Sequence, residues 1–318
     1  MRTVITLLFG LTVASFAGMA HAAVVNASTT ASLIASTPVP STTDNLTTSP
    51  AAAALAVKYQ QLKDELTHSV FNAPILLSSN TTEGLAQGEV YAILNAPFAS
   101  LSETLSQPAH WCELAILHIN VKTCTYEKDQ VQLFIGRRYY EPPEQAFALQ
   151  YRFENLSDNF HLSIRLTAPK GPIGTSNYLT SFEAIPIDDD HSFIHFTYHY
   201  QFGLVAGLAM ETYLATIGRN KVGFTITGAD ADRQPIYIKG LQGVVERNVM
   251  RYIFAIQSVL ESQNSAIEFR QKAQLVRWYA HIQEFPRQLV EFTHEEYMDI
   301  KQKELANQQA MQQALASP

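Results

Sequence analysis

Three histidines occupy positions where they could bind a metal ion or act in acid–base chemistry. His195 and His199 share one predicted strand, and His161 lies at the start of another. Four residues of a strand span about 13 Å, so His195 and His199 cannot bind one ion together. The closely spaced ligands of ordinary zinc sites are also missing. The pattern therefore predicts a solvated polar face and no metal site.

Other reactive motifs are incomplete. Asp230 and Asp232 resemble the start of a calcium loop, but the later ligands of that loop are missing. Gly171 and Gly174 are not followed by the Gly-Lys-Ser/Thr of a phosphate-binding loop. The sequence also lacks a G-x-S-x-G nucleophile motif. We therefore nominate no catalytic residue and expect no cofactor, which favours a binding protein over an enzyme.

The residues best suited to binding are aromatic. They alternate with polar residues along predicted strands, which gives one sheet face many rings and hydroxyls. Such a wall suits an amphiphilic ligand in a cavity, although the same rings could simply fill the core. Arg137, near the end of a strand, could bind an acidic head group or be an ordinary charged strand end. The cavity candidates are Phe147, Tyr151, Phe153, Phe182, Phe196, Tyr198, Tyr200, Tyr252 and Arg137.

Period-two alternation predicts the strands that carry these side chains. The alternating runs are 147–153, 160–166 and 194–202, with weaker runs at 131–135 and 178–185. One apolar and one polar face per strand is typical of an antiparallel sheet covered on one side. A helix over Gly240–Ser262 should cover it, because apolar residues recur there at spacings of three and four.

The segment before these strands predicts a strand and two short helices. The strand runs over 89–94 and ends before Pro97. Ser100 with Glu103 forms a capping-box pattern for the first helix. The second helix runs from Ala109 to about His118.

This order of elements resembles the START-like (Bet v 1-like, polyketide-cyclase-like) helix-grip superfamily, in an exported bacterial branch. The resemblance rests on GEVYAILNAPF at 88–98, on the helix followed by PAHW at 108–111, and on the topology over about 84–262. It implies an α+β fold in which a curved antiparallel sheet grips the long C-terminal helix. It also implies that a hydrophobic or lipid-like molecule binds in a cavity between them.

Several segments fall outside that family core. A helix-like stretch at 204–217 and a hairpin at 222–226 and 236–239 precede the long helix and could form a lid or an edge. Extra helices are predicted at the N-terminal side (55–71) and at the C-terminal side (266–285 and 293–314).

Three functions follow from these features. The first is an exported carrier or binding protein for a lipid-like molecule. The second is a cyclase- or hydrolase-type enzyme in the same cavity, which would need an inward-facing pair such as a tyrosine with Glu183 or Arg247. The third is an envelope structural or assembly factor that holds a protein partner through the C-terminal helices.

The N-terminus predicts export. Residues 1–22 combine Arg2, an apolar stretch and Ala-His-Ala, as a cleavable signal peptide does, and the apolar stretch is too short to span a membrane. Residues 23–54 predict a disordered tether rich in Ala, Ser, Thr and Pro. We expect a START-like domain over 55–265 and a helical extension over 266–318. The protein would be soluble and periplasmic in a Gram-negative bacterium, or otherwise secreted, without a transmembrane anchor after signal removal.

Charge and cysteine usage agree with export. The chain has 22 Lys+Arg against 29 Asp+Glu, which argues against nucleic-acid binding. Cys112 and Cys124 are the two cysteines, and an oxidising compartment favours a disulfide between them. Their spacing supports neither a metal pair nor a redox pair, since no C-x-x-C is present. The bond would stabilise the fold by about 3 kcal/mol.

Overall fold

The computed structural model describes residues 49–82, 84–216 and 218–317. The predicted signal peptide and residues 23–48 of the predicted tether lie outside these ranges. Among the described residues, no helix combines the length and the apolarity that crossing a membrane requires.

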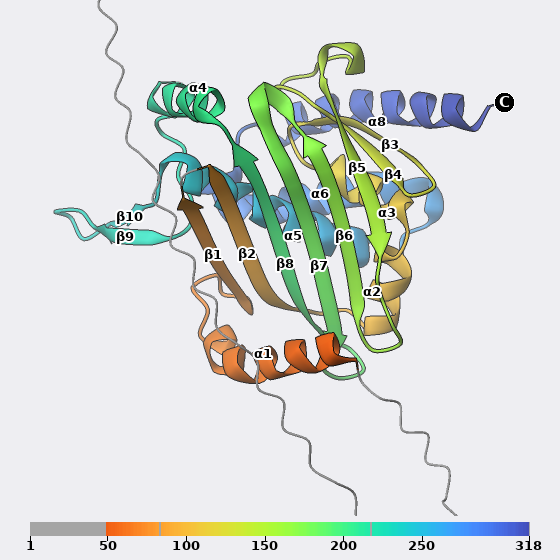
Figure 1. Ribbon diagram of the computed structural model, residues 1–318, viewed down its shortest axis with the longest axis horizontal. Helices are drawn as coiled ribbons and strands as arrows, with labels where there is room; N and C mark the ends of the chain where they lie inside the picture. The colour runs from red at the N-terminus through yellow and green to blue at the C-terminus, as the bar shows by residue number, and fades with distance from the viewer. Residues whose placement is uncertain (1–48, 83, 217, 318) are drawn as a thin grey trace, which may run out of the picture. The chain divides into compact units, whose positions relative to one another are not determined.

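An eight-stranded antiparallel sheet forms the centre of the folded region (Figure 1). Its strand order is β1-β2-β8-β7-β6-β5-β4-β3. The strands are β1 (Ile75–Thr82), β2 (Leu85–Leu94), β3 (Val121–Glu127), β4 (Gln130–Ile135), β5 (Phe147–Asn155), β6 (Leu162–Lys170), β7 (Thr175–Pro186) and β8 (Ser192–Phe202). A separate hairpin consists of β9 (Ile226–Ala229) and β10 (Pro235–Tyr237).

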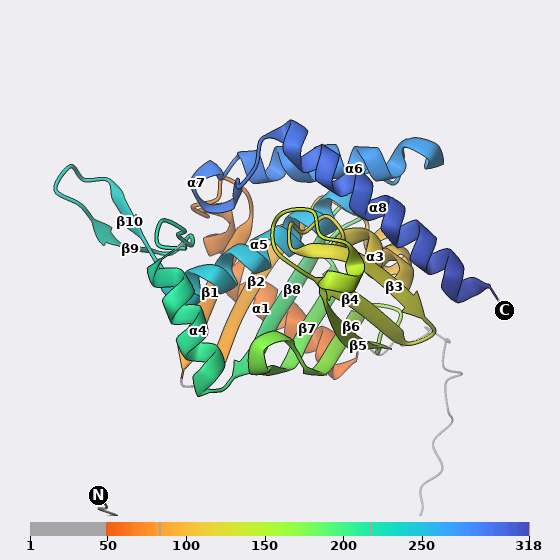
Figure 2. The ribbon, with the colours of Figure 1, turned by 90° about the horizontal axis from the view of Figure 1, so that it is seen from above.

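Helices cover both faces of the sheet. Leu55 and Leu66 of α1 (Pro50–Thr67) pack on the outer face against Ile185 and Phe193. The inner face carries α5 (Gly240–Glu261). A further layer beyond it consists of α6 (Ile267–Gln283), α7 (Pro286–Leu289) and α8 (His294–Ala316) (Figure 2). The other helices are α2 (Phe98–Leu105), α3 (Pro108–Ala115) and α4 (Leu204–Ala215). The predicted α+β fold, with a sheet around a long helix, is confirmed.

The alternation of residue types predicts the inner strands but misses both edge strands. In β3 the first five residues are all buried, because α3 and α8 pack against the strand, so no period of two is visible. β1 has the sequence ILLSSNTT, in which polar residues hide the strand pattern. The two edge strands are thus harder to predict from residue type than the inner strands, because their burial does not follow a period of two.

Helix starts differ from the prediction in two places. α1 begins at Pro50, where the hydroxyl oxygen of Ser49 accepts a hydrogen bond from the Ala52 amide, so the last residues of the predicted tether are helical. Proline suits this first-turn position because its missing N–H would have no partner there. The predicted capping box at Ser100 is wrong, since α2 already begins at Phe98 and has no side-chain cap.

The disulfide prediction is confirmed. Cys112 of α3 is bonded to Cys124 of β3, and both residues are buried. The bond fixes α3 against the edge strand.

The closest approach of helix and sheet occurs at Gly88 in β2. A Cβ atom there would lie 2.6 Å from Val245 Cγ1 and 2.6 Å from Val249 Cγ2, both on α5. Real Cβ contacts do not reach this distance, so only glycine allows α5 to lie against β2 in this way. The position of the long helix therefore depends on the absence of one side chain.

We predict that Gly88→Ala lowers the free energy of unfolding by about 1–3 kcal/mol, because the added methyl overpacks the helix–sheet contact. Gly228→Ala is the matched control: a Cβ there meets nothing within 4 Å, and the change should stay within about 0.5 kcal/mol. Urea denaturation measures both variants. Equal stability of the two would contradict the close contact.

A buried ion network joins α8 to the sheet. Glu304 of α8 lies 2.6 Å from Lys122 of β3 and 2.6 Å from Lys301, and the side chains of all three are at most 1% exposed. Lys122 Nζ also donates to the carbonyls of Ile119 and Tyr139. Burial lowers the pKa of Lys301 to about 8, which shows how strongly this environment opposes an uncompensated charge.

Glutamines of α8 satisfy the open edge of β3. Gln308 accepts a hydrogen bond from the Cys124 amide, and Gln312 both accepts from the Tyr126 amide and donates to the Tyr126 carbonyl. An uncovered edge strand would expose these groups to other chains. The Gln-rich C-terminal helix is thus part of the domain, and a capping box of Thr293 and Glu296 begins it.

We predict that Glu304→Gln lowers the free energy of unfolding by about 3–5 kcal/mol, because it leaves two buried ammonium groups without their counter-ion. Glu295→Gln changes an exposed carboxylate in the first turn of the same helix and should cost less than about 0.5 kcal/mol. Chemical denaturation followed by circular dichroism gives both values. A loss at Glu304 no larger than at Glu295 would refute the network's role.

Candidate ligand cavity

A cavity of about 220 Å³ lies on the inner side of the sheet beside α5. Its walls come from β4, β5, β7, β8, the loop before β3 and the first residue of that strand, the turn at Pro172–Gly174, Met210 of α4 and one side of α5. This is the location that the family resemblance implies, between the sheet and the long helix.

Five tyrosines form most of the polar wall. Tyr151 lies on β5, Tyr178 on β7, Tyr198 and Tyr200 on β8, and Tyr252 on α5. The rings of Tyr178 and Tyr200 stack with centroids 5.2 Å apart. Tyr198 lies 6.1 Å from Tyr252, so the rings of sheet and helix meet across the cavity.

The tyrosine hydroxyls differ in their partners. Tyr178 donates to Thr175 Oγ1 at 2.8 Å, and the hydroxyl of Tyr200 lies 3.9 Å from Met210 Sδ. No hydrogen bond joins the hydroxyls of Tyr198 and Tyr252 to any residue that the structure describes. These two hydroxyls remain available to a ligand as donors or acceptors.

The cavity wall carries no charge at neutral pH. Burial raises the pKa of all five tyrosines above the ordinary value of 10.0. Burial, together with the nearby positive charges of Arg251 and Lys301, lowers the pKa of His118 well below 6.5. Among the described residues that line the cavity there is no Asp, Glu, Lys or Arg. A charged ligand group would therefore lose its hydration without gaining a counter-ion.

His118 brings a buried polar atom to this wall. Its Nδ1 accepts a hydrogen bond from the Asn120 amide at 3.2 Å, which assigns the proton of the neutral ring to Nε2. Nε2 is buried and has no hydrogen bond of good geometry with any described residue, although the Asn248 side chain is close enough to raise the His118 pKa. A buried donor without a partner costs about 1–3 kcal/mol, so a ligand acceptor there would be favoured.

The C-terminal helix holds the backbone of this histidine. Lys301 Nζ donates to the His118 carbonyl at 2.7 Å and to the Val121 carbonyl at 2.9 Å. The Tyr297 hydroxyl donates to the Leu117 carbonyl at 3.0 Å. The buried ion network is thereby connected to the cavity wall.

The structure brings some of the predicted cavity residues together and separates others. Tyr151, Tyr198, Tyr200 and Tyr252 line the cavity. The buried rings of Phe153, Phe182 and Phe196 instead belong to the surrounding core. Ligand binding by any of them stays a prediction.

Phe147 and Arg137, both predicted as cavity residues, lie away from this cavity. Phe147 is 40% exposed, because it stands at the first position of β5, beyond the cover of the helices. The Arg137 side chain is 86% exposed, pairs with Glu141 and does not line this cavity.

Sequence reasoning missed His118, Asn248 and Tyr178. Tyr178 could have been found, since it shares the alternation of Thr180 and Phe182 along β7. His118 lies in a turn between α3 and β3, where no periodic pattern indicates which way a side chain points.

Among the comparisons with known proteins, only solved structures match this chain. No family model and no curated protein matches the chain. A truncated norcoclaurine synthase from Thalictrum flavum matches with 14% identity and a TM-score of 0.31, over 44% of this chain and 89% of that one. A START superfamily protein from Mycobacterium smegmatis matches with 12% identity and a TM-score of 0.29, over 42% and 89%. A Streptomyces aromatase/cyclase matches with 18% identity and a TM-score of 0.29, over 42% and 86%.

The strand order decides the fold. β2 pairs with β8, α2 and α3 connect β2 to the far edge of the sheet, and α5 follows on the inner face. The chain has a helix-grip fold, in which the antiparallel sheet packs around the long helix α5. β1, α1, the α4–β10 insertion and helices α6–α8 lie outside this core of sheet and helix.

The outer face carries a separate polar network. His195 lies between Glu89 and Glu183, with Nε2 2.7 Å from Glu89 and Nδ1 3.2 Å from Glu183. His161 lies 3.2 Å from the other oxygen of Glu183, whereas His199 makes no such contact with the described residues. No group of three or more metal-ligand side chains within the described part of the chain is arranged to hold an ion.

The pKa values of this network are coupled by its hydrogen bonds. The hydrogen bond with His195 lowers the pKa of Glu89 to about 2, and those with His161 and His195 lower the pKa of Glu183 to about 2. Burial lowers the pKa of His195, but its bonds to Glu183 and Glu89 outweigh this, so the pKa is raised above 6.5. Because its pKa is raised in the folded state, His195 stabilises the fold below about pH 6.5 and loses this effect as the pH rises through its folded pKa. The carboxylates stabilise above about pH 4.5 and lose their effect as pH falls towards 2.

We predict that His195→Gln flattens the fall in unfolding free energy that occurs as the pH rises above about 6.5. His199→Gln is the control on the same strand, and it should retain the fall, because burial alone lowers the pKa of His199. Denaturation at several pH values provides the curves. Parallel wild-type and His195→Gln curves would contradict the network.

Proposed function

We propose that this protein binds a small, neutral, ring-containing amphiphile in the tyrosine-lined cavity. The observation that carries the proposal is an uncharged wall of five tyrosines and aliphatic side chains, which also includes His118, whose buried Nε2 has no hydrogen bond of good geometry with the described residues. A ligand with one hydrogen-bond acceptor and a flat apolar body suits both features.

Size narrows the class of ligand. A cavity of about 150 Å³ admits benzene, and sites for drug-sized ligands span roughly 300–1,000 Å³. The volume of about 220 Å³ lies between these limits. A molecule of one or two rings suits this space better than a complete lipid chain does.

The enzyme alternative receives less support. Glu183 lies on the outer face of the sheet with His195 and His161, so it cannot pair with a cavity tyrosine. Arg247 donates to the Val222 carbonyl and does not line the cavity. His118 presents a donor nitrogen, whereas a general base would need a free acceptor.

Export remains part of the proposal. The Cys112–Cys124 disulfide supports folding in an oxidising compartment, such as the periplasm of a Gram-negative bacterium. The predicted role of the C-terminal helices in holding a protein partner has weaker support, because α8 uses its polar side chains within the domain.

The proposal predicts that 2-naphthol binds and that 2-naphthoate binds at least about tenfold more weakly at pH 7, because the charged group would be buried without a counter-ion. Tyr198→Phe and Tyr252→Phe should each weaken 2-naphthol binding by about threefold to tenfold, the value of one hydrogen bond. Isothermal titration calorimetry measures these affinities.

Tyr237→Phe, in the hairpin away from the cavity, is the control and should bind like the wild type. Absence of 2-naphthol binding, or equal affinity for the naphthol and the naphthoate, would overturn the proposal.

A further inference from the structure

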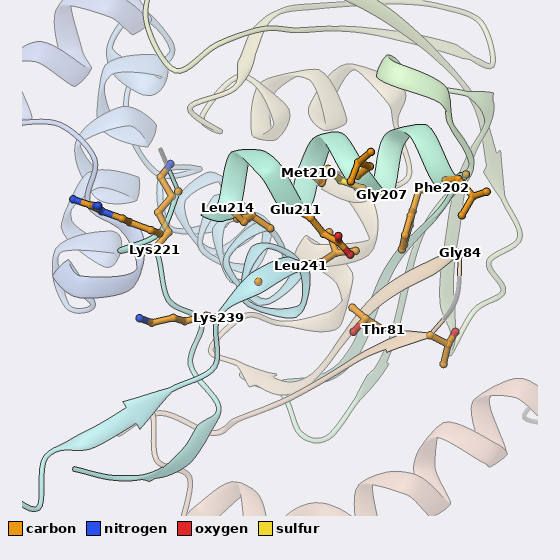
Figure 3. A pocket seen from close by; sticks show the side chains of 17 residues that line it. Thr81, Gly84, Phe202, Gly207, Met210, Glu211, Leu214, Lys221, Lys239 and Leu241 are labelled. Carbon is orange, nitrogen blue, oxygen red and sulfur yellow. The ribbon is translucent and has the colours of Figure 1, made fainter. Parts of the chain in front are cut away.

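The insertion between β8 and α5 encloses a second hollow. A groove of about 1030 Å³ lies beneath α4, between the β1–β2 turn and the first turn of α5 (Figure 3). We refer to it as the α4 groove. Its volume is at the upper end of the range for small-molecule sites, roughly 300–1,000 Å³. α4 belongs to the insertion between β8 and α5.

The middle of the α4 groove is apolar. Phe202, Met210, Leu214 and Leu241 line it from β8, α4 and α5 (Figure 3). Leu208 of α4 also lines it and is 67% exposed. Uncovered apolar surface in a concave site favours an apolar ligand.

One end of the α4 groove is basic. Figure 3 shows Lys221 and Lys239 at this end, opposite Thr81 and Gly84. Lys221 pairs with Glu291 at 2.6 Å, but Glu291 also lies 2.8 Å from Arg251 and 3.8 Å from Arg138. Three cations therefore share a single carboxylate.

Two further positive groups add to this end. The side chains of Lys239 and Arg219 form no ion pair or hydrogen bond with the described residues. The 22-residue helix α5 begins directly after Lys239, and its N-terminus adds a positive potential. Glu211 is the one acidic residue that lines the groove within the described part of the chain.

We propose that the α4 groove binds a long-chain carboxylate, with its alkyl chain along α4 and its carboxylate at Lys239 and Lys221. This site is distinct from the tyrosine-lined cavity: it takes a negatively charged head group, whereas the cavity takes a neutral ligand. Met210 lines both spaces, and its sulfur contacts the Tyr200 hydroxyl, so this side chain separates them. The tyrosine-lined cavity suits a flat neutral ring, and the α4 groove suits an alkyl chain with a charged end.

The test titrates the full folded protein with saturated carboxylates of 8 to 14 carbons and with the matching alcohols, below their micelle concentrations. Each added methylene should tighten binding about two- to fourfold until the groove is full. Dodecanoate should bind about tenfold more tightly than dodecanol, because of the basic end. Calorimetry measures both series.

Two variants locate the site. Lys239→Glu should remove the preference for dodecanoate over dodecanol, whereas Lys272→Glu, at an exposed position of α6, should leave it intact. Gly207→Leu should weaken both ligands by about tenfold, because a Cβ at Gly207 already approaches the Phe202 ring to 3.4 Å and a longer side chain fills the groove.

Tyr252→Phe distinguishes the two sites. It should leave dodecanoate binding unchanged while weakening 2-naphthol. The proposal is overturned if dodecanoate does not bind, if Lys239→Glu and Gly207→Leu bind it like the wild type, or if Tyr252→Phe weakens it as much as Gly207→Leu does.

Discussion

The contact between α5 and β2 at Gly88 is the constraint on which the rest of the structure depends. Because Gly88 has no side chain, Val245 and Val249 reach the backbone of β2 directly. The long helix therefore packs most closely on β1, β2 and β8. Towards β4, β5 and β7 the space between helix and sheet is filled by tyrosine rings, and the cavity lies there. The cavity thus forms where the close contact at Gly88 gives way to tyrosine rings that hold the helix away from the sheet.

The opposite edge of the sheet is fixed by buried charges and not by apolar packing alone. Glu304 neutralises Lys122 and Lys301, and Lys301 in turn holds the carbonyls of His118 and Val121. Replacing such a network is less costly than breaking it, since one uncompensated buried charge destabilises strongly. The C-terminal helix, remote in sequence, thereby sets the place of the histidine that lines the cavity.

The sequence predicts what is periodic and misses what depends on tertiary contacts. The apolar spacing of α5 and the alternation of β8 place Tyr198, Tyr200 and Tyr252 on the inner side without any structure. The sequence does not predict β3, because both faces of this strand are covered and its residues do not alternate. It does not predict the role of His118, because a residue in a turn belongs to no periodic pattern. Lys122 and Lys301 look like surface residues until their common partner Glu304 is known.

The central claim is that the tyrosine-lined cavity is the binding site for a neutral ring-containing molecule. Nuclear magnetic resonance of protein carrying ¹³C at the tyrosine ring carbon that bears the hydroxyl tests it directly, because the chain has 14 tyrosines in different places. On addition of 2-naphthol, we expect shifts for Tyr151, Tyr178, Tyr198, Tyr200 and Tyr252 and none for the exposed Tyr139 and Tyr140. Shifts confined to exposed tyrosines, or no shift at saturating naphthol, would contradict the account.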